Sequence, residues 1–455
     1  LYLFTGYLAV TGVVSGSADA AALRAAKLTI SNMVPVVGGI LADASETVLV
    51  SAGLMKNAAG IYGLLAVTAV CDLLPDRAQA AADRLEKAGA PRPFVTTDYR
   101  AVLSRDDVDA VYVAVAWEAH VEVAAAAMRA GKPIGLEAGG AYSLDDCWQL
   151  VHTYEQTHTE LMFMENCCYG KRELMLQNMV RQGVLGSVMH CSGAYQHDLR
   201  EEITSGREIR HYRLRNYIHR NGENYPTHEI GPIAKLLDIN NGNRIVSLSS
   251  FSSAAKGLRE YAAKKRGADD PLAAVDYAQG DVVTTVMTCA GGQTIVLTLN
   301  TTLPHAYSRR FEVHGTRGMY CEDNDSLFID GDPAHMKDEW TWRGQWGNAD
   351  GFEERYLHPL WKDGVASDMH GGIDHLVFAA FLDMVRSGGH APIDVYDAAV
   401  YMAITPLSEN SIACGGAPMA FPDFTGGRWT MRTGLAEGEY ALDRRDVGRD
   451  LYFID

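Results

Sequence analysis

The chain has 455 residues, enough for two or three domains, and its 47% hydrophobic and 21% charged residues are typical of a globular protein. Its formal net charge of −17 argues against a nucleic-acid-binding surface, which would need basic patches. The eight cysteines form no CxxC pair and show no metal-ligand spacing, so they predict free thiols in a reducing compartment, favour a cytoplasmic location and indicate no metal site.

Residues 1–66 differ in composition from the rest of the chain. They contain only six charged residues and are rich in Ala, Gly, Val and Leu. Their apolar runs, such as "LYLFTGYLAVTGVV", are shorter than the roughly 20 residues that a membrane-spanning helix needs. We predict an extra helical segment that is foreign to the remainder, with membrane association open only if this segment is genuine.

Residues 67–165 alternate between strand-like and helix-like segments. Strands are predicted in "LAVTAVCD", "VDAVYVAVA", "PIGLEAG" and "ELMFMEN", short apolar runs that are typical of buried parallel strands. Between them we predict helices, one with Pro75 near its start and Gly89 at its end, and another capped by Ser143 with Asp146 at its third position. The alternation predicts a doubly wound parallel sheet, as in a Rossmann-like NAD(P)-binding domain.

Residues 166–455 become strand-rich from about residue 186. The runs "NRIVSLSSFSS", "DVVTTVMTCA", "QTIVLTLNTTL" and "RRFEVHGTRGMYCED" predict one large, mostly antiparallel sheet. Two helical runs, "GGIDHLVFAAFLDMVRSG" and "VYDAAVYMAITPLSENSIAC", are expected to pack back on it. This part is predicted to be an α+β substrate domain.

Asp72 ends the first predicted strand, where a dinucleotide-binding fold places a carboxylate that binds a ribose. Such a carboxylate follows a glycine turn and a helix by about 20 residues. The nearest pattern, "AAGIYG", ends at Gly63, nine residues before Asp72, and leaves no room for a helix. The sheet is therefore predicted to be incomplete, without its first strand and its glycine turn.

The block "RNGENYPTHEIGP" at residues 220–232 has the form R-N-G-x-x-Y-P-T-H-x-x-G-P. Through this block and the strand ends, residues 67–455 resemble the Gfo/Idh/MocA family of NAD(P)-dependent oxidoreductases. Within that family they look most like glycoside hydrolase family 109, whose characterised activity is that of an α-N-acetylgalactosaminidase. Residues 10–66 instead resemble a piece of stage III sporulation protein AE, which predicts a chimera joined near residue 66.

The resemblance implies NAD as cofactor and a small carbohydrate as substrate. It places Asp72, Trp117, His120, Glu137 and Asn166 near NAD. Family dehydrogenases carry Glu-Lys-Pro where this chain has "EAG", so the lysine that moves a hydroxyl proton is absent. This departure argues against simple sugar dehydrogenation.

The same resemblance implies the residues that act on the sugar. It makes Tyr225, His228 and Tyr307 acid/base candidates, and Arg213 and Tyr169 sugar contacts. Read from the residues alone, the histidine is a satisfied side chain at a helix start and the tyrosines pack. Both readings stay open at this point.

The implied mechanism is transient oxidation at sugar C3, elimination of the C1 leaving group, addition of water and re-reduction, on a hexosaminide or related glycoside. Two alternatives remain: a sugar oxidoreductase that releases NADH, and a catalytically impaired chimeric or truncated product. A homo-oligomer formed through the antiparallel sheet is a further expectation, and no nucleic-acid partner is expected.

Overall fold

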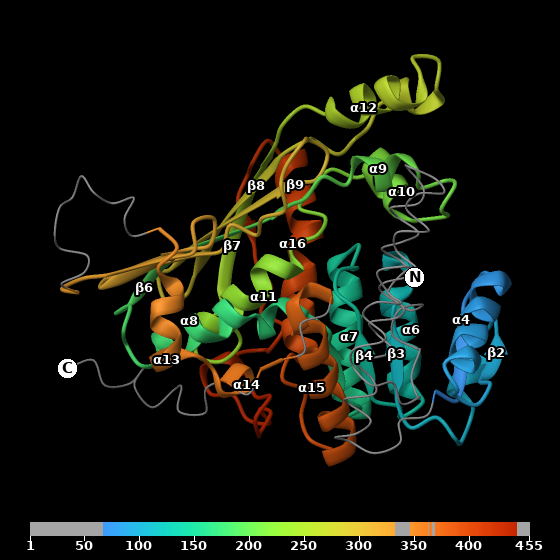
Figure 1. Cartoon of the computed structure of the whole chain (residues 1–455), viewed down its shortest axis with the longest axis horizontal. Coiled ribbons are helices and arrows are strands. Elements are labelled where there is room, and N and C mark those ends of the chain that lie inside the picture. Colours follow the sequence, from blue (N-terminus) through green and yellow to red (C-terminus); the bar gives the residue numbers. More distant parts are fainter. Residues whose placement is uncertain (1–66, 333–345, 363, 366–368, 444–455) are drawn as a thin grey trace, which may run out of the picture.

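The computed structural model describes residues 67–332, 346–362, 364–365 and 369–443 (Figure 1). The predicted helical segment over 1–66 lies outside these residues. The described chain forms an α/β part followed by a part built on one large mixed sheet, as the sequence predicts. No helix in these described ranges is long and apolar enough to cross a membrane.

The parallel strands of the α/β part fall into two groups. One is a two-stranded sheet of β1 and β2, and the other is a three-stranded sheet in the order β3-β4-β5. The strands are β1 (Ala69–Cys71), β2 (Phe94–Thr96), β3 (Val111–Val113), β4 (Ile134–Leu136) and β5 (Leu161–Phe163). In a doubly wound dinucleotide-binding sheet, the first strand occupies the centre. Within residues 67–332 no strand joins β1 to β3, which agrees with an incomplete sheet.

Residues 67–165 contain four helices. They are α4 (Pro75–Lys87), α5 (Tyr99–Leu103), α6 (Trp117–Arg129) and α7 (Leu144–Thr157). The first and last begin where the sequence predicts, whereas the short helix α5 was not predicted. Ser143 Oγ accepts the amide of Asp146 at 3.1 Å and the Asp146 carboxylate accepts the amide of Ser143 at 3.0 Å, so α7 starts with a capping box. Pro75 occupies the first turn of α4, where its missing N–H costs nothing.

The second part is built on an eight-stranded sheet in the order β12-β11-β10-β6-β9-β8-β7-β13. All neighbours pair antiparallel except β6 with β9, so the sheet is mostly antiparallel, as predicted. Its strands are β6 (Val188–Gln196), β7 (Ile245–Ser252), β8 (Val283–Cys289), β9 (Thr294–Asn300), β10 (Glu312–Gly315), β11 (Gly318–Cys321), β12 (Ser326–Ile329) and β13 (Met419–Ala420).

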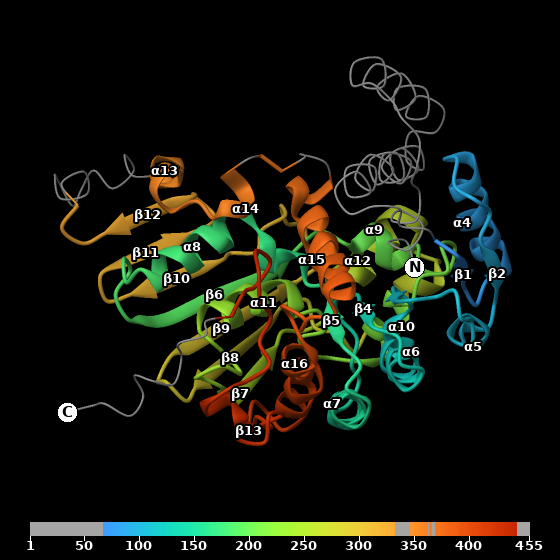
Figure 2. The same ribbon diagram turned by 90° about the horizontal axis from the view of Figure 1, so that it is seen from below.

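Helices cover one face of this sheet (Figure 2). The helices of this part are α8 (Lys171–Arg181), α9 (Arg200–Thr204), α10 (Arg213–His219), α11 (Thr227–Leu236), α12 (Gly257–Arg266), α13 (Glu353–Tyr356), α14 (Pro359–Lys362), α15 (Ile373–Ser387) and α16 (Val395–Ala413). Helix α11 packs on β6, and α16 contacts both β7 and α7. Because α16 touches both parts, it joins the parallel strands to the large sheet.

Candidate active site

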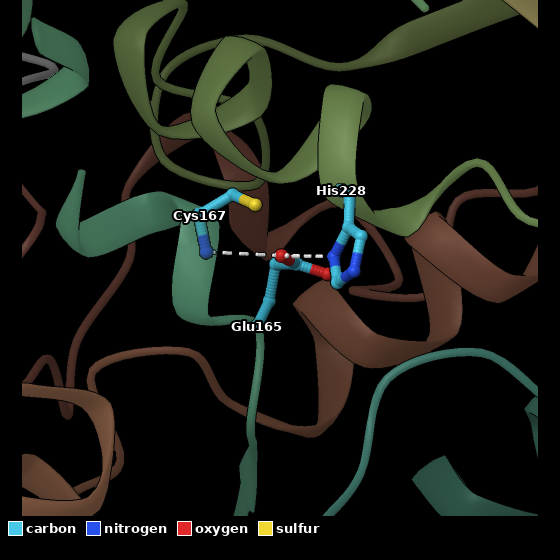
Figure 3. Close-up of side chains that lie close together, drawn as sticks. All are labelled: Glu165, Cys167 and His228. Atoms are coloured by element: carbon cyan, nitrogen blue, oxygen red, sulfur yellow. Dashed lines mark hydrogen bonds and ion pairs between the residues drawn. The ribbon is translucent and has the colours of Figure 1, made fainter. Parts of the chain in front are cut away.

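A chain of three hydrogen-bonded side chains lies where the parallel strands meet α11. Glu165 follows β5 and caps the short 3-10 helix Asn166–Tyr169, while His228 lies in the first turn of α11. The His228 Nδ1 is 2.8 Å from Glu165 Oε1 (Figure 3). The His228 Nε2 is 3.2 Å from the Tyr225 hydroxyl. The carboxyl edge of parallel strands is where α/β proteins bind ligands.

Burial and close contacts shift the pKa values within this group of three side chains. Glu165 has no exposed surface, and the neighbouring imidazole is its charged partner. Burial lowers the pKa of His228, but its neighbours Glu165, Tyr225 and Cys167 together outweigh burial and raise this pKa well above its usual value. Burial also raises the pKa of the Tyr225 phenol. At neutral pH the arrangement therefore holds a proton on His228 beside a protonated tyrosine.

An aromatic wall borders Tyr225. The ring of Trp117, at the start of α6, stacks on Tyr225 with 5.3 Å between centroids and 16° between planes. The ring centroid of Tyr195, on β6, is 4.8 Å from that of Tyr225. Gly139 lies against this stack with φ +88°, and a Cβ there would come within 2.6 Å of the Trp117 indole nitrogen. The Gly at this point of "EAGG" is thus required by close packing as well as by its backbone conformation.

Arg213 supplies a cation against the same wall. Its guanidinium lies 5.3 Å from the Tyr225 ring and 5.6 Å from the Trp117 ring, within cation–π range. Its Nη1 is 3.2 Å from Glu202 Oε1. Its Nε is buried and has no hydrogen-bond partner among the described residues. This unsatisfied donor is unusual for a buried polar atom in a folded protein.

Glu137 and Asn166 follow β4 and β5 at the same edge. The Tyr112 hydroxyl and the amide of Ala138 both donate to Glu137. Burial raises the pKa of Glu137 to about 7, and the nearby carboxylates of Asp374 and Glu165 act in the same direction. A carboxyl group that titrates near neutrality is suited to proton transfer.

Asn166 is connected to a second histidine, His370, through hydrogen bonds to Asp374. Its Nδ2 donates to Asp374 Oδ1 at 2.5 Å, and Asp374 Oδ2 is 2.7 Å from His370 Nδ1. The hydrogen bond to Asp374 raises the pKa of His370. His370 sits in the left-handed backbone region, with φ +53°, just before α15. It is half exposed at the side of the site.

Two predicted cofactor residues lie away from this group. Asp72 follows β1, and its Oδ1 accepts the amide of Leu74 at 2.9 Å. Burial raises the pKa of Asp72. His120 is buried with its ring nitrogens 3.1 Å from the Gly139 carbonyl and 2.9 Å from the Val115 carbonyl, and burial lowers its pKa to about 4. His120 thus pins the turn before α6 to the glycine loop, and its ring nitrogens are engaged within the protein.

The two remaining predicted tyrosines differ in their surroundings. Tyr169 is fully buried, and its hydroxyl donates to the carbonyl of Tyr440 at 2.9 Å, so the side chain packs beneath the site. Tyr307 is 55% exposed and its ring lies 5.3 Å from that of His197. His197 continues to Tyr195, which ties Tyr307 to the rim of the aromatic wall. Sugar contact by either tyrosine stays a prediction.

The structure adds three side chains that the sequence reading missed. Glu165 pairs with a histidine 63 positions away, and Tyr195 and Cys167 reach the group from β6 and the 3-10 helix. Glu165 directly follows a predicted parallel strand, which is a signal for a site residue. Tyr195 lies in a strand with no local sign of its role.

The fold and the site define a two-part protein of the Rossmann-fold oxidoreductase type. Residues 49–164 match the oxidoreductase family with an NAD-binding Rossmann fold, and residues 169–431 match the glycosyl hydrolase 109 C-terminal domain. The chain belongs to glycosyl hydrolase family 109, within the Gfo/Idh/MocA oxidoreductases. Residues 1–75 match stage III sporulation protein AE, so the seam predicted near residue 66 lies where two matches overlap.

Curated relatives and solved structures agree with this assignment. An alpha-N-acetylgalactosaminidase of Tannerella forsythia is 36% identical over 404 residues, covering 83% of this chain and 84% of that protein. A glycosyl hydrolase family 109 protein of Stenotrophomonas maltophilia is 38% identical, covering 80% and 85%. Levoglucosan dehydrogenase, solved with NADH and levoglucosan, has the same fold at a TM-score of 0.60 and 18% identity, covering 81% and 95%.

Proposed function

We propose that this chain is an NAD-dependent glycosidase that acts on α-N-acetylgalactosaminides. The observation that carries the proposal is the chain Glu165–His228–Tyr225, set beside Arg213 and Trp117 at the carboxyl edge of the parallel strands. The substrate class follows from the Tannerella relative, which is named for that activity. No carboxylate pair of the ordinary hydrolytic kind needs to be assigned under this scheme.

The residues at the strand ends fit part of an NAD molecule. Asp72 provides a carboxylate after β1, where such folds bind ribose hydroxyls, and Glu137 and Asn166 border the place where the parallel strands face the site. A bound NAD supplies a reversible hydride acceptor for the sugar. A glycine turn for the pyrophosphate is not present in residues 67–332, so this part of the binding has no assigned residues.

The chain's own residues then bind the sugar and move protons. The free Nε donor of Arg213 orients sugar oxygens against the stacked rings of Trp117 and Tyr225. Because His228 is held protonated by Glu165, it can donate from Nε2 to the Tyr225 oxygen while Tyr225 donates its own proton to an oxygen of the substrate. Glu137, with a pKa of about 7, is the second candidate for proton transfer.

The test separates hydrolysis from dehydrogenation. The purified full chain is incubated with NAD and a chromogenic aryl α-N-acetylgalactosaminide in heavy water. A glycosidase of this kind releases the aryl alcohol, shows no net growth of NADH absorbance, and carries solvent deuterium into C2 of the product sugar. NADH growth in step with sugar oxidation, without aryl alcohol, would favour the oxidoreductase alternative. A chain that neither takes up NAD nor releases the alcohol would favour the impaired chimera.

We also propose a homo-oligomer through the large sheet. Exposed apolar side chains on three strands fall on one face by their register: Phe251, Val286 and Phe328. Exposed apolar patches of this kind mark association surfaces. Size-exclusion chromatography with light scattering measures the molar mass of the protein in solution. A monomer at all concentrations would contradict the proposed oligomer.

A further inference from the structure

Three side chains at the site have the donor atoms of a transition-metal centre. The carboxylate of Glu165, the thiol of Cys167 and the imidazole of His228 each offer one ligand atom, and these atoms all lie within 4.8 Å of one another (Figure 3). Oxygen, sulfur and nitrogen donors together favour Zn²⁺ over the hard cations Mg²⁺ and Ca²⁺. Sequence spacing did not reveal this group, because 61 positions separate Cys167 from His228.

The distances allow a metal ion with small side-chain rotations. Bond lengths of about 2.0–2.3 Å place the ligand atoms of tetrahedral zinc roughly 3.3–3.8 Å apart. Glu165 Oε1 and His228 Nδ1 are closer than this, at 2.8 Å, because they share a hydrogen bond. Opening this pair by less than an ångström and turning the thiol inward would complete a three-ligand site. The backbone positions come from two packed helix starts and need not change.

A second observation points to a missing partner for the same group. Glu165 has no exposed surface, and its Oε2 has no hydrogen-bond partner among the described residues. A buried carboxylate oxygen without a partner is costly, and a bound cation would satisfy it. This atom belongs to the residue that already contacts both other ligands, which makes it the natural centre of a cation site.

The surroundings also hold the ligands in place. The amide of Cys167 donates to Glu165 Oε1 at 3.1 Å, and the Tyr225 hydroxyl lies 3.2 Å from His228 Nε2. Such outer hydrogen bonds orient metal ligands and strengthen binding. With three protein ligands, a fourth position remains for water or an oxygen atom of the sugar.

We propose that Glu165, Cys167 and His228 bind one Zn²⁺ ion and that this binding inhibits the enzyme reversibly. The ion displaces the proton from His228 Nδ1 and the proton from the Cys167 thiol, and both protons leave to solvent. With Nδ1 bound to the metal, His228 loses its hydrogen bond to Glu165, and the hydrogen-bonded path from Glu165 through His228 to Tyr225 is broken. The inhibitory consequence rests on the proposed glycosidase function, whereas the binding of the ion does not.

Cobalt provides a readout that does not depend on activity. The full chain, stripped of metals with a chelator, is titrated with Co²⁺ alone and then with Zn²⁺ in competition. We expect one equivalent of Co²⁺ to give a sulfur-to-cobalt charge-transfer band and the intense visible bands of four-coordinate cobalt. Zn²⁺ should bleach both. Absence of the sulfur band at saturating Co²⁺ would overturn the proposal.

Variants locate the site. Cys167→Ser should abolish the charge-transfer band, and Glu165→Gln should weaken Co²⁺ binding by about 10–100-fold or more, the range known for weaker outer-shell changes. Cys414→Ser removes an exposed thiol at the end of α16 and should leave the titration unchanged. A band that persists in Cys167→Ser, or vanishes in Cys414→Ser, would contradict the assignment. If Cys167→Ser does not fold by circular dichroism, Glu165→Gln decides the outcome.

The inhibitory step is measured separately. Glycosidase activity should fall with Zn²⁺ along the same binding curve and return when a chelator is added. A cobalt-binding site whose occupation leaves activity unchanged would remove the inhibitory step and keep the metal site. If the chain shows no glycosidase activity without metal, the proposed function fails while the cobalt titration still decides the site.

Discussion

The two groups of parallel strands differ in how much hydrophobic core they pack against. Strands β4 and β5 are fully buried and belong to the main core, which continues through α16 into the large sheet. Strands β1 and β2 pack with α4 on a small separate cluster of Val70, Ala81 and Leu85. Leu73, just beyond β1, is 81% exposed. Glu137 and Glu165 therefore follow the well-packed group, while Asp72, which we propose binds a ribose, follows the thin one.

This difference teaches that the two halves of a dinucleotide site can depend on different stabilising contacts. The group of β1, β2 and α4 is tied to the second part by Arg77, whose guanidinium donates to the Ile209 carbonyl at 2.6 Å, and by an exposed pair of Arg210 with Asp76. Exposed pairs contribute little to stability. Substitutions in the two groups should therefore have effects of different size and kind.

The largest effect is expected at His228. His228→Gln keeps a polar side chain of similar reach but removes the proton held against Glu165, so kcat should fall by about 10²–10⁴-fold, the usual contribution of general acid/base catalysis. NAD binding, measured by fluorescence titration, should change little because the cofactor residues are untouched. Wild-type kcat in this variant would refute the assigned role.

A buried charge tests the main core, to which β4 and β5 belong. Lys235 is buried with its Nζ 2.7 Å from Asp397 Oδ2 and 2.9 Å from Asp443 Oδ2. Lys235→Met leaves two buried carboxylates without their cation, so the free energy of unfolding should fall by about 3–5 kcal/mol. Urea unfolding measures it. A loss under about 1 kcal/mol would show that this network is not strongly stabilising.

NAD binding by an Asp72 variant tests the thin group of β1, β2 and α4. Asp72→Asn removes the charge expected on the ribose, and hydrogen bonds to charged groups contribute about 1.5–3 kcal/mol, so the Kd for NAD should rise about tenfold or more. The thermal midpoint should stay within a few degrees, because Asp72 lies outside the main core. An unchanged Kd would place the cofactor elsewhere.

Glu223, a buried residue in the loop before α11, gives the stability of the main core a pH dependence. Burial raises the pKa of Glu223 to about 8, from about 4.5 in an unfolded chain. Between these values the folded protein keeps a proton that the unfolded chain releases, so stability falls as pH rises, by up to about 1.4 kcal/mol per pH unit. Glu223→Gln should flatten this slope in urea unfolding between about pH 5 and pH 8. An identical slope would contradict the raised pKa.

The smallest effect is expected at Arg210. Arg210→Ala breaks the 2.6 Å pair with Asp76, whose side chain is largely exposed, and should cost under about 1 kcal/mol of unfolding free energy. Amide hydrogen exchange should nevertheless quicken in α4 and leave β4 and β5 unchanged. Equal quickening in both groups would show that they open together.

Local chemistry made much of the fold predictable. Pro75 and Ser143 mark helix starts by rules that involve only a few neighbouring residues, and the apolar runs of β4 and β5 are typical of strands buried on both faces. The parallel pairing of β6 with β9 was not predicted, because strands about 100 residues apart pair through the tertiary fold and leave no local pattern.

The site was predictable only in part for the same reason. Tyr225 and His228 lie in one sequence block, and the resemblance identifies them together. Glu165 and Tyr195 reach the block from other elements, and no spacing rule connects them to it. Tyr169 shows a further limit, because the sequence gives no sign that its hydroxyl donates to the carbonyl of Tyr440 in the core.

Helix α16 helps to set the distance between the two parts of the protein that meet at the site. It contacts α7 and β5 of the first part and β7 and α11 of the second part. A single 19-residue helix therefore packs against both parts of the protein. Its capping box at Asp394 and its almost complete burial hold it in place on both parts, even though Pro406 removes one backbone hydrogen bond within it. The spacing between the strand edge that carries Glu165 and the helix that carries His228 is thus set by packing that does not depend on a ligand, which lowers the cost of ordering the site on binding.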